Sequence, residues 1–429
     1  MNTKLQRFFS GREVKNASWI IISRVAQMVL SLLVGLISAR YLGPGNYGLI
    51  GYGTSYVGLF SSVCTLGLNS ILVKELIDRP DEQGKTLGTV LMLRGLAATA
   101  SFLLIGIIVF FIDRDDPAAI AVTLLCSISL VFHIFDTLNY WFQSRYKSKI
   151  SSLATLLAYV VVSIYKIILL VASKSVFWFA FSTSVDYICV AVFLLICYKR
   201  DRGPKLSFSI ARGKEMLGRS YHYIIAGAMV SIYGQTDKLM LKQMLDKASV
   251  GYYTTATTIC GMWTFVLAAI IDSMYPTIIS AHKEEDKKDF LRLNKQLYAI
   301  VFYVSVGVSL LFCFCGDFAV GLLYGEKYAP AAAPLKVITW YTAFSYLGTA
   351  RNAWIVCEHK QHMLKYIYIV AAVTNVILNA VLIPIAGATG AAVASLVTQI
   401  ITSIVFPFLV SELRPNAIMM IDAIMLRFR

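Results

Sequence analysis

The fold is decided by the stretch from Arg24 to Asn69, which reads RVAQMVLSLLVGLISARYLGPGNYGLIGYGTSYVGLFSSVCTLGLN. Its polar and small residues recur at helical spacing, which predicts two helices that each carry one narrow polar face on an apolar surface. The faces consist of Arg24, Gln27, Ser31, Gly35 and Ser38 in the first helix, and of Thr54, Gly58, Ser61, Thr65 and Asn69 in the second. Small side chains also line membrane helices because they let two backbones approach closely. That role explains most of these residues but not the charge of Arg24.

The same pattern returns later in the chain. A shift of roughly 203 residues pairs Thr54 with Thr257, Gly58 with Gly261, Ser61 with Thr264, Thr65 with Ala268, Asn69 with Asp272, Gly35 with Lys238 and Gly48 with Gly251. A second fragment, Trp141 to Lys147, resembles Trp354 to Lys360 at a similar shift. The chain therefore reads as two copies of one unit, each of which turns a polar face toward a shared space.

The composition is that of a membrane protein. Of the 429 residues, 58% are hydrophobic and only 15% are charged, and the mean hydropathy is +0.68, a balance that soluble domains do not reach. The net charge of +15 comes from bases in short connectors, where they determine topology and do not form a nucleic-acid surface. The eight cysteines lie within or beside apolar segments without metal-ligand spacing, so they are expected to act as small apolar residues.

Apolar segments long enough to cross a bilayer recur from end to end. We place them at 17–40, 47–72, 86–112, 118–142, 150–172, 176–198, 219–241, 250–279, 293–315, 331–355, 363–384 and 388–411. The sequence thus predicts an all-α polytopic membrane protein with about twelve transmembrane helices. Because each half holds an even number of spans, the halves form two parallel six-helix repeats around a central cavity.

The longest basic connector contains Gly203 and Pro204, which favours a boundary there. We expect an N-terminal six-helix bundle at 1–200, a cytoplasmic basic linker at 201–218 and a C-terminal six-helix bundle at 219–429. Bases gather in alternate connectors, so the positive-inside rule predicts that both termini are cytoplasmic. One opposite connector, Asp113 to Asp116, has more acidic than basic residues.

Several charged residues fall inside the predicted spans, where each costs about 2.5–3.5 kcal/mol at mid-membrane. They are Arg24, Arg94, Asp136, Lys166, Asp186, Asp237, Lys238 and Asp272. Arg94 lies close enough to the cytoplasmic end to reach the headgroups. Asp136 follows His133 at helical spacing, which suits either a proton-sensitive pair or a packing device. The run from Gly234 to Lys238 is the most polar in any span, and it suits either an ion-binding or gating site or a salt-bridged seam between helices.

Two motifs connect the chain to a known family. The segment Ala39 to Gly48, and the segment Gln235 to Leu241 followed by Val250 to Tyr253, resemble the Wzx-type polysaccharide flippases of the multidrug/oligosaccharidyl-lipid/polysaccharide exporter superfamily. The resemblance extends over essentially the whole chain. It implies a transporter that moves undecaprenyl-diphosphate-linked oligosaccharide across the bacterial inner membrane by alternating access, with a cationic cavity for the diphosphate and the sugars.

Other classes fit less well. Lipid II flippases of the same superfamily carry an arginine in the first span, as here, but also in the second and eighth, where this chain has none. Multidrug exporters of the superfamily often have an acidic residue in the first span, which this chain lacks. A membrane-embedded polysaccharide polymerase or glycosyltransferase would need a longer connector to present catalytic residues, so we do not expect an enzyme.

Candidate site residues follow from these patterns. For binding the substrate, an O-antigen, capsule or exopolysaccharide precursor, we expect Arg24, Gln27, Ser31, Asn69, Gln235 and Lys238; for ion coupling or gating we expect Asp237, Asp272, Asp136 and Lys166. An arginine offers a bidentate fork to a diphosphate, and Ser, Asn and Gln suit sugar hydroxyls. The expected partners are H⁺ or Na⁺, membrane lipids and the polysaccharide polymerase machinery, but no nucleic acid, cofactor or bound metal.

The predicted topology can be tested with single cysteines at Asp115 and Ser207. An impermeant thiol reagent applied outside intact cells should label Asp115→Cys but not Ser207→Cys, because the basic connector lies in the cytoplasm. The unaltered chain, with its native cysteines, gives the background. Outside labelling of Ser207→Cys alone would reverse the orientation.

Overall fold

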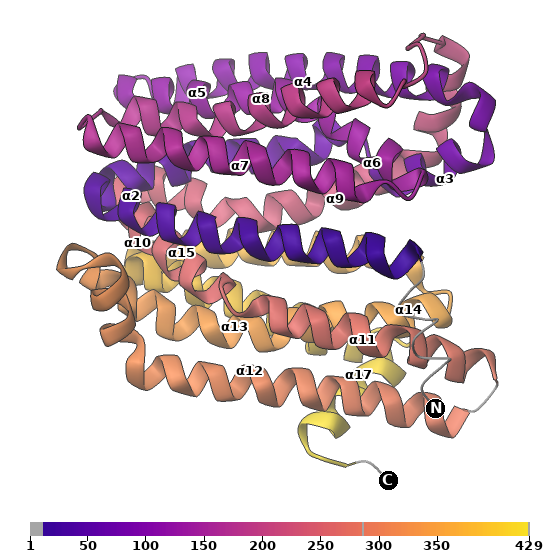
Figure 1. Ribbon diagram of the computed structural model, residues 1–429. Coiled ribbons are helices and arrows are strands. Elements are labelled where there is room, and N and C mark those ends of the chain that lie inside the picture. The colour runs from indigo at the N-terminus through magenta and orange to yellow at the C-terminus, as the bar shows by residue number, and fades with distance from the viewer. Residues whose placement is uncertain (1–11, 285–286, 428–429) are drawn as a thin grey trace. The chain divides into compact units, whose positions relative to one another are not determined.

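The computed structural model describes residues 12–284 and 287–427, except for the side chains of residues 12–18, 20–22, 24 and 70. Every regular element in this part of the chain is a helix (Figure 1). The α-helices of the described residues are α2 (Arg12–Thr65), α3 (Asn69–Asp78), α4 (Gln83–Ile112), α5 (Pro117–His133), α6 (Thr137–Ser144), α7 (Ser148–Val171), α8 (Val176–Arg200), α9 (Ile210–Met244), α10 (Lys247–Gly261), α11 (Thr264–Lys283), α12 (Lys287–Tyr324), α13 (Ala332–Ala350), α14 (Asn352–Cys357), α15 (Leu364–Ile400), α16 (Phe406–Leu409) and α17 (Arg414–Ile424).

Eight helical segments of the described chain are long and apolar enough to cross a membrane. Two of them, with 41 and 49 residues, are far longer than the roughly 20 residues that one crossing needs. Each is interrupted at a glycine in a left-handed conformation: Gly43 has φ 72° and Gly387 has φ 57°. The predicted all-α polytopic fold is confirmed, while the arrangement as twelve spans in two repeats stays a prediction.

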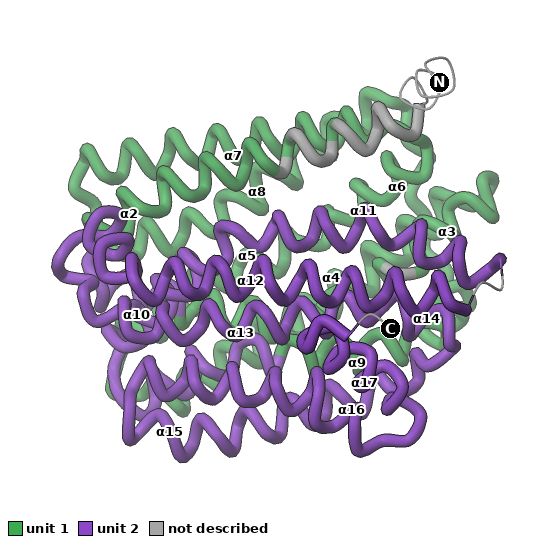
Figure 2. The backbone as a smooth tube through the Cα atoms, turned by 90° about the horizontal axis from the view of Figure 1, so that it is seen from below, with its two compact units in different colours: residues 1–42, 52–231 green, residues 43–51, 232–429 purple. Residues whose placement is uncertain are grey.

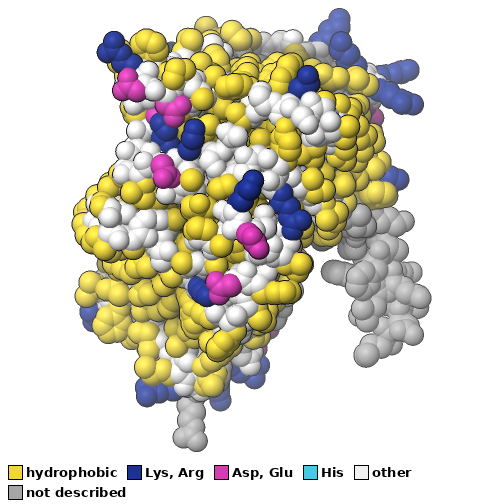
Figure 3. Space-filling model, turned by 90° about the vertical axis from the view of Figure 1, so that its left-hand side faces the viewer, with side chains coloured by type: hydrophobic (Ala, Val, Ile, Leu, Met, Phe, Trp, Pro, Cys, Tyr) yellow, Lys and Arg dark blue, Asp and Glu magenta, His cyan; other side chains and the backbone are white. Residues whose placement is uncertain are grey.

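The surface agrees with a lipid environment. Phe314 and Val171 are both 83% exposed, and Phe318 and Ile385 are more than 70% exposed. Figure 3 shows one face of the molecule covered largely by hydrophobic side chains, with acidic and basic groups interspersed. Apolar side chains this exposed would be costly in water but are favourable against hydrocarbon.

The chain divides into two compact units (Figure 2). Unit 1 comprises residues 1–42 and 52–231, and unit 2 comprises residues 43–51 and 232–429. Helix α9 begins at Ile210, inside the predicted linker, and runs through the change of unit between Ser231 and Ile232. The predicted bundles at 1–200 and 219–429 therefore stay a prediction, and the part of the linker after residue 209 is helical.

The core of unit 1 surrounds Trp141, which is fully buried. Leucines of α3 and α4 pack in the same cluster. The indole Nε1 donates to Oε1 of Gln83 at 3.0 Å, and the guanidinium of Arg145 lies 4.9 Å from the ring centroid. In unit 2 a larger apolar cluster joins α11, α12, α13, α14 and α17.

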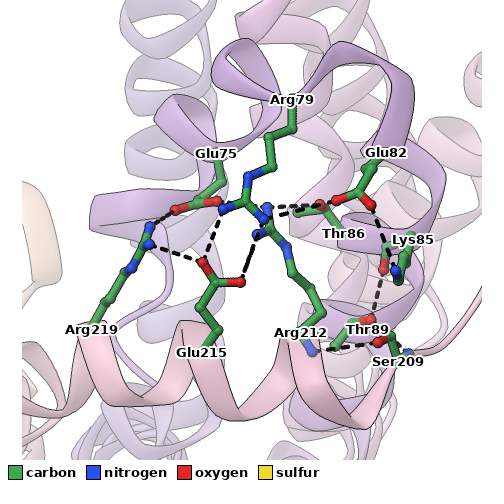
Figure 4. A network of polar contacts seen from close by, with 10 residues as sticks. All are labelled: Glu75, Arg79, Glu82, Lys85, Thr86, Thr89, Ser209, Arg212, Glu215 and Arg219. Carbon is green, nitrogen blue, oxygen red and sulfur yellow. Dashed lines mark hydrogen bonds and ion pairs between the residues drawn. The ribbon is translucent and has the colours of Figure 1, made fainter.

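An ionic network fixes the start of α9 to α3 (Figure 4). Glu75 of α3 is buried and accepts from Arg212 at 2.6 Å and from Arg219 at 2.5 Å. Glu215 accepts from Arg212 at 2.9 Å and from Arg79 at 3.0 Å. The hydrogen bond from Arg212 lowers the pKa of Glu215, so this contribution to stability is present at neutral pH and is lost as the pH falls.

The segment before α9 lies directly against α4 through two glycines. The backbone N–H of Ser207 donates to the carbonyl of Gly84 at 3.2 Å. A Cβ at Gly84 would lie 2.2 Å from the carbonyl oxygen of Lys205, and one at Gly88 would lie 2.4 Å from that of Ser207. Only glycine allows this approach, so the linker is fastened to unit 1 by its backbone as well as by charge.

Within unit 2, residues 43–51 cross α10 in a reciprocal contact. A Cβ at Gly48 would lie 1.8 Å from the carbonyl oxygen of Lys247, and one at Gly251 would lie 2.1 Å from that of Pro44. The shift of roughly 203 residues relates Pro44 to Lys247 and Gly48 to Gly251. The same contact is thus made twice, as in a two-fold interface, where each partner supplies the same patch.

Substituting Gly48 should expose this constraint. Gly48→Ala should lower the stability of the purified protein by roughly 1–3 kcal/mol, because the new methyl group meets backbone that cannot rotate away. The control is Gly307→Ala on α12, where a Cβ has no neighbour within 4 Å and alanine favours the helix. Thermal unfolding in detergent measures both, and equal Tm values for the two variants would contradict the crossing.

Candidate functional site

Among the described acidic side chains of unit 2, the most completely enclosed is Asp237 on α9, which is 5% exposed. Its Oδ1 accepts from the amides of Asn375 at 3.0 Å and Asn379 at 2.6 Å. Its Oδ2 accepts from the hydroxyl of Ser395 at 2.5 Å and from that of Tyr253. Four donors converge on one carboxylate, which offsets the cost of removing its charge from water.

These donors come together for simple geometric reasons. Asn375 and Asn379 are one turn apart on α15, so they share a face, and the amide of Asn379 also donates to Oδ1 of Asn375 at 3.0 Å. The left-handed turn at Gly387 then reverses the chain within the same element. Ser395, beyond this turn, reaches the carboxylate that the two asparagines contact before it.

Asp237 lines a cavity of about 350 Å³ in unit 2. Lys238 lines the same cavity, together with Tyr233, Tyr341 and Thr257. The hydroxyls of Tyr233 and Tyr341 are 2.6 Å apart, and the amide of Gln399 donates to the hydroxyl of Tyr233. The cavity therefore combines one acid, one base and a hydrogen-bonded polar wall.

This arrangement suits a proton or a monovalent cation. Carboxylate, amide and hydroxyl oxygens are the ligands that hard cations prefer. Both asparagines present nitrogen to the carboxylate, and Oδ1 of Asn379 is buried without a hydrogen-bond partner. A half-turn of each amide would present oxygen instead. Among the described residues no group of three or more His, Cys, Asp or Glu side chains could hold a metal ion.

Unit 1 contains two polar cavities. One of about 250 Å³ is lined by residues of α2, α6 and α7 with the turn before α6; one of about 240 Å³ shares Gln27, Asp136 and Thr155 with it. The amide of Gln27 donates to the hydroxyl of Thr155 at 3.3 Å. Asp136 accepts from the amide of Asn139.

The predicted substrate residues are distributed over both units. Gln27 lines the cavities of unit 1, and Ser31 lies within hydrogen-bonding reach of Tyr159 on α7. Asn69 accepts from Arg94, which is buried and also donates to Thr137 at 2.8 Å. Arg94 therefore does not extend to the headgroups as expected, because it is fixed between helices.

Three further predictions concern Arg24, Gln235 and Lys238. The side chain of Arg24 lies outside the described part of the structure. Lys238 lines the cavity of unit 2, whereas Gln235, one turn earlier on α9, is not among its lining residues.

The residues predicted for ion coupling or gating are also distributed over both units. Asp237 lies at the centre of a polar network, and Asp136 lies between the two cavities of unit 1. Lys166 on α7 lies near Asp186 on α8, whose Oδ1 has no hydrogen-bond partner. Asp272 is exposed on α11 and forms no ion pair with Lys238 or any other described base.

Sequence reasoning missed the residues that surround Asp237. Asn375 and Asn379 stand at positions i and i+4 of an otherwise apolar span, and this spacing of two amides was the available signal. Tyr253 and Ser395 carry no such signal, since their role depends on how α10 and α15 pack against α9.

Solved structures of the same fold are membrane transporters. A multidrug resistance MATE family transporter of the MOP superfamily, in an inward-facing conformation, matches with a TM-score of 0.69 at 12% identity over 94% of this chain and 99% of that chain. The lipid II flippase MurJ, in an inward closed conformation, matches with a TM-score of 0.68 at 15% identity over 95% and 91%. The chain thus has the fold of these polytopic transporters.

The sequence comparisons identify the family, which is more specific than the fold. The polysaccharide biosynthesis protein family matches residues 37–334, and the chain belongs to it. The capsular polysaccharide biosynthesis protein CapF of Staphylococcus aureus is 19% identical over 91% of this chain and 97% of its own length. A protein of Escherichia coli (strain K12) described as an O-antigen transporter is 20% identical over 92% and 96%. The chain is therefore a multi-pass membrane protein of the flippase type.

Proposed function

We propose that the protein moves undecaprenyl-diphosphate-linked oligosaccharide repeat units from the cytoplasmic to the outer leaflet of the bacterial inner membrane. Support comes from the family match over residues 37–334 and from the relatives in capsule and O-antigen biosynthesis. Both termini lie in the cytoplasm, and the two units alternate between inward and outward access. The protein acts as a transporter and not as an enzyme, and its product passes to the polymerase machinery.

Lipid II export and multidrug export are the alternatives within the superfamily. Proteins with these functions share the fold at 12–15% identity, which carries no substrate information. The second predicted span contains no arginine and the first contains no carboxylate. These absences favour the lipid-linked oligosaccharide.

Arg24 supplies the charge that meets the diphosphate in this proposal. Arg24→Ala should abolish surface polysaccharide, and Arg24→Lys should reduce it, because a lysine keeps the charge but loses the bidentate fork. The measurement is complementation of a deletion strain, with surface polysaccharide compared at equal amounts of membrane-inserted protein.

The control is Arg40→Ala, which removes an exposed arginine from the same helix, α2. It should leave export near the wild-type level. Wild-type export from Arg24→Ala, or equal losses from both variants, would remove Arg24 from the diphosphate site.

We further propose that Asp237 binds the coupling ion, H⁺ or Na⁺. The observation that supports this proposal is that four donors converge on one carboxylate of α9. One donor comes from α10, and the others come from the two parts of α15, before and after Gly387. An ion that binds there competes with these donors for the oxygens. Ion binding therefore changes how strongly α15 is held to α9. If unit 2 has two arrangements of these helices, the ion binds them with different affinities and so favours one of them.

Ion binding should appear as an increase in the stability of the folded protein. Wild-type protein should gain stability with Na⁺ over choline, by about 2.7 kcal/mol when Na⁺ is at 100 times its Kd. Asp237→Asn should lose this response. The matched control, Asp272→Asn, removes the same charge from the exposed face of α11 and should keep it.

Thermal unfolding of the wild type, Asp237→Asn and Asp272→Asn is measured across a range of ion concentrations and pH values. A response that survives in Asp237→Asn and vanishes in Asp272→Asn would transfer the coupling role to Asp272.

A further inference from the structure

The larger polar cavity of unit 1 has an unusual lining. All ten side chains around its 250 Å³ or so carry an oxygen or nitrogen group, in a chain that is 58% hydrophobic. They are Ser23, Gln27, Asp136, Asn139, Tyr140, Gln143, Ser148, Ser151, Ser152 and Thr155. Asp136 is the one carboxylate among these ten residues, and none of the ten is a lysine or arginine. A space of this size holds roughly eight water molecules.

Three elements build the lining with regular spacing. Residues 136, 139, 140 and 143 come from the turn before α6 and from α6 itself, and residues 148, 151, 152 and 155 come from α7. Both sets follow the pattern i, i+3, i+4 and i+7, which places each set on a single helical face. Ser23 and Gln27, one turn apart on α2, close the third side.

Four of the lining side chains keep hydrogen-bonding positions for a ligand. Asn139 donates to Asp136, and Gln27 donates to Thr155 at 3.3 Å. The hydroxyls of Ser151 and Thr155 donate to the backbone of their own helix, which keeps their oxygens as acceptors. An amide has two N–H donors and an oxygen with two lone pairs, so Gln27 and Asn139 each retain further positions for a ligand.

This chemistry discriminates between ligand classes. A phosphate would need a cationic or backbone donor site, and an apolar drug would need apolar walls; the lining supplies neither. Neighbouring hydroxyl groups, by contrast, pair well with amides, hydroxyls and a single carboxylate, since each hydroxyl both donates and accepts. The occupant that fits is a neutral, polyhydroxylated molecule.

We propose that this cavity binds a sugar of the oligosaccharide, an inference that rests on the proposed function. The adjoining cavity of about 240 Å³, which shares Gln27, Asp136 and Thr155, provides room for a second sugar.

The test compares two substrates in proteoliposomes that contain the full-length protein. One is the lipid-linked repeat unit isolated from the native host, and the other is undecaprenyl diphosphate carrying only the first sugar. Gln143→Leu should raise the half-saturating concentration for the full repeat unit by roughly three- to tenfold, the effect of losing one hydrogen bond. The single-sugar lipid should change less than the full unit, and Gln143→Asn should restore part of the difference.

Gln296→Leu is the matched control, because Gln296 is exposed on α12 in unit 2 and lines no described cavity. It should leave both substrates unchanged. Asn139→Leu provides a second variant within the cavity, with thermal unfolding used to confirm that each protein is folded.

The outcomes separate the two proposals. No effect of Gln143→Leu on either substrate would show that the cavity holds only water, whereas equal effects on both would place the first sugar at Gln143. If the wild-type protein moves neither lipid, the proposed function fails, and the sugar site fails with it.

Discussion

A carboxylate removed from water must be surrounded by donors or give up its charge, and unit 2 is organised around this requirement at Asp237. Asn375, Asn379, Ser395 and Tyr253 all donate to it, from α10 and from both arms of α15. Removing any one donor would strand part of a buried charge. The packing of these helices therefore depends on the state of one carboxylate, and an ion that binds there acts on the packing itself.

The two units differ in the chemistry of their interiors. Unit 2 encloses an acid, a base and a tyrosine wall in one cavity, which suits charge that is gained and lost. Unit 1 encloses hydroxyls and amides, which suit a neutral ligand rich in hydroxyl groups. The reciprocal contact of Gly48 and Gly251 is the kind of contact that a duplicated unit would make. The proposed ion site lies in unit 2 and the proposed sugar site in unit 1.

Much of the fold could be predicted from the sequence because hydropathy and glycine position are local signals. The polytopic helical class, the turn near Gly43 and the polar run around Asp237 were all visible in that way. The pairing of Glu75 with Arg212 was not visible, because it joins residues that are distant in the chain and sit in connectors counted only for their charge. The structure also changes the interpretation of Arg94, whose guanidinium is buried against Asn69 and Thr137 and does not reach the headgroups. The cavity of unit 1 could have been anticipated in part, since its two polar faces share one spacing, but their convergence depends on packing.

The central claim is that an ion gradient acting through unit 2 drives movement of a lipid-linked oligosaccharide. Its most direct test is the initial rate at which such a lipid crosses the bilayer of proteoliposomes, measured with and without an imposed Na⁺ or pH gradient. The rate should exceed that of protein-free vesicles and should rise further when the gradient is applied. A rate that equals the protein-free value, or that is unchanged by either gradient, would contradict the account.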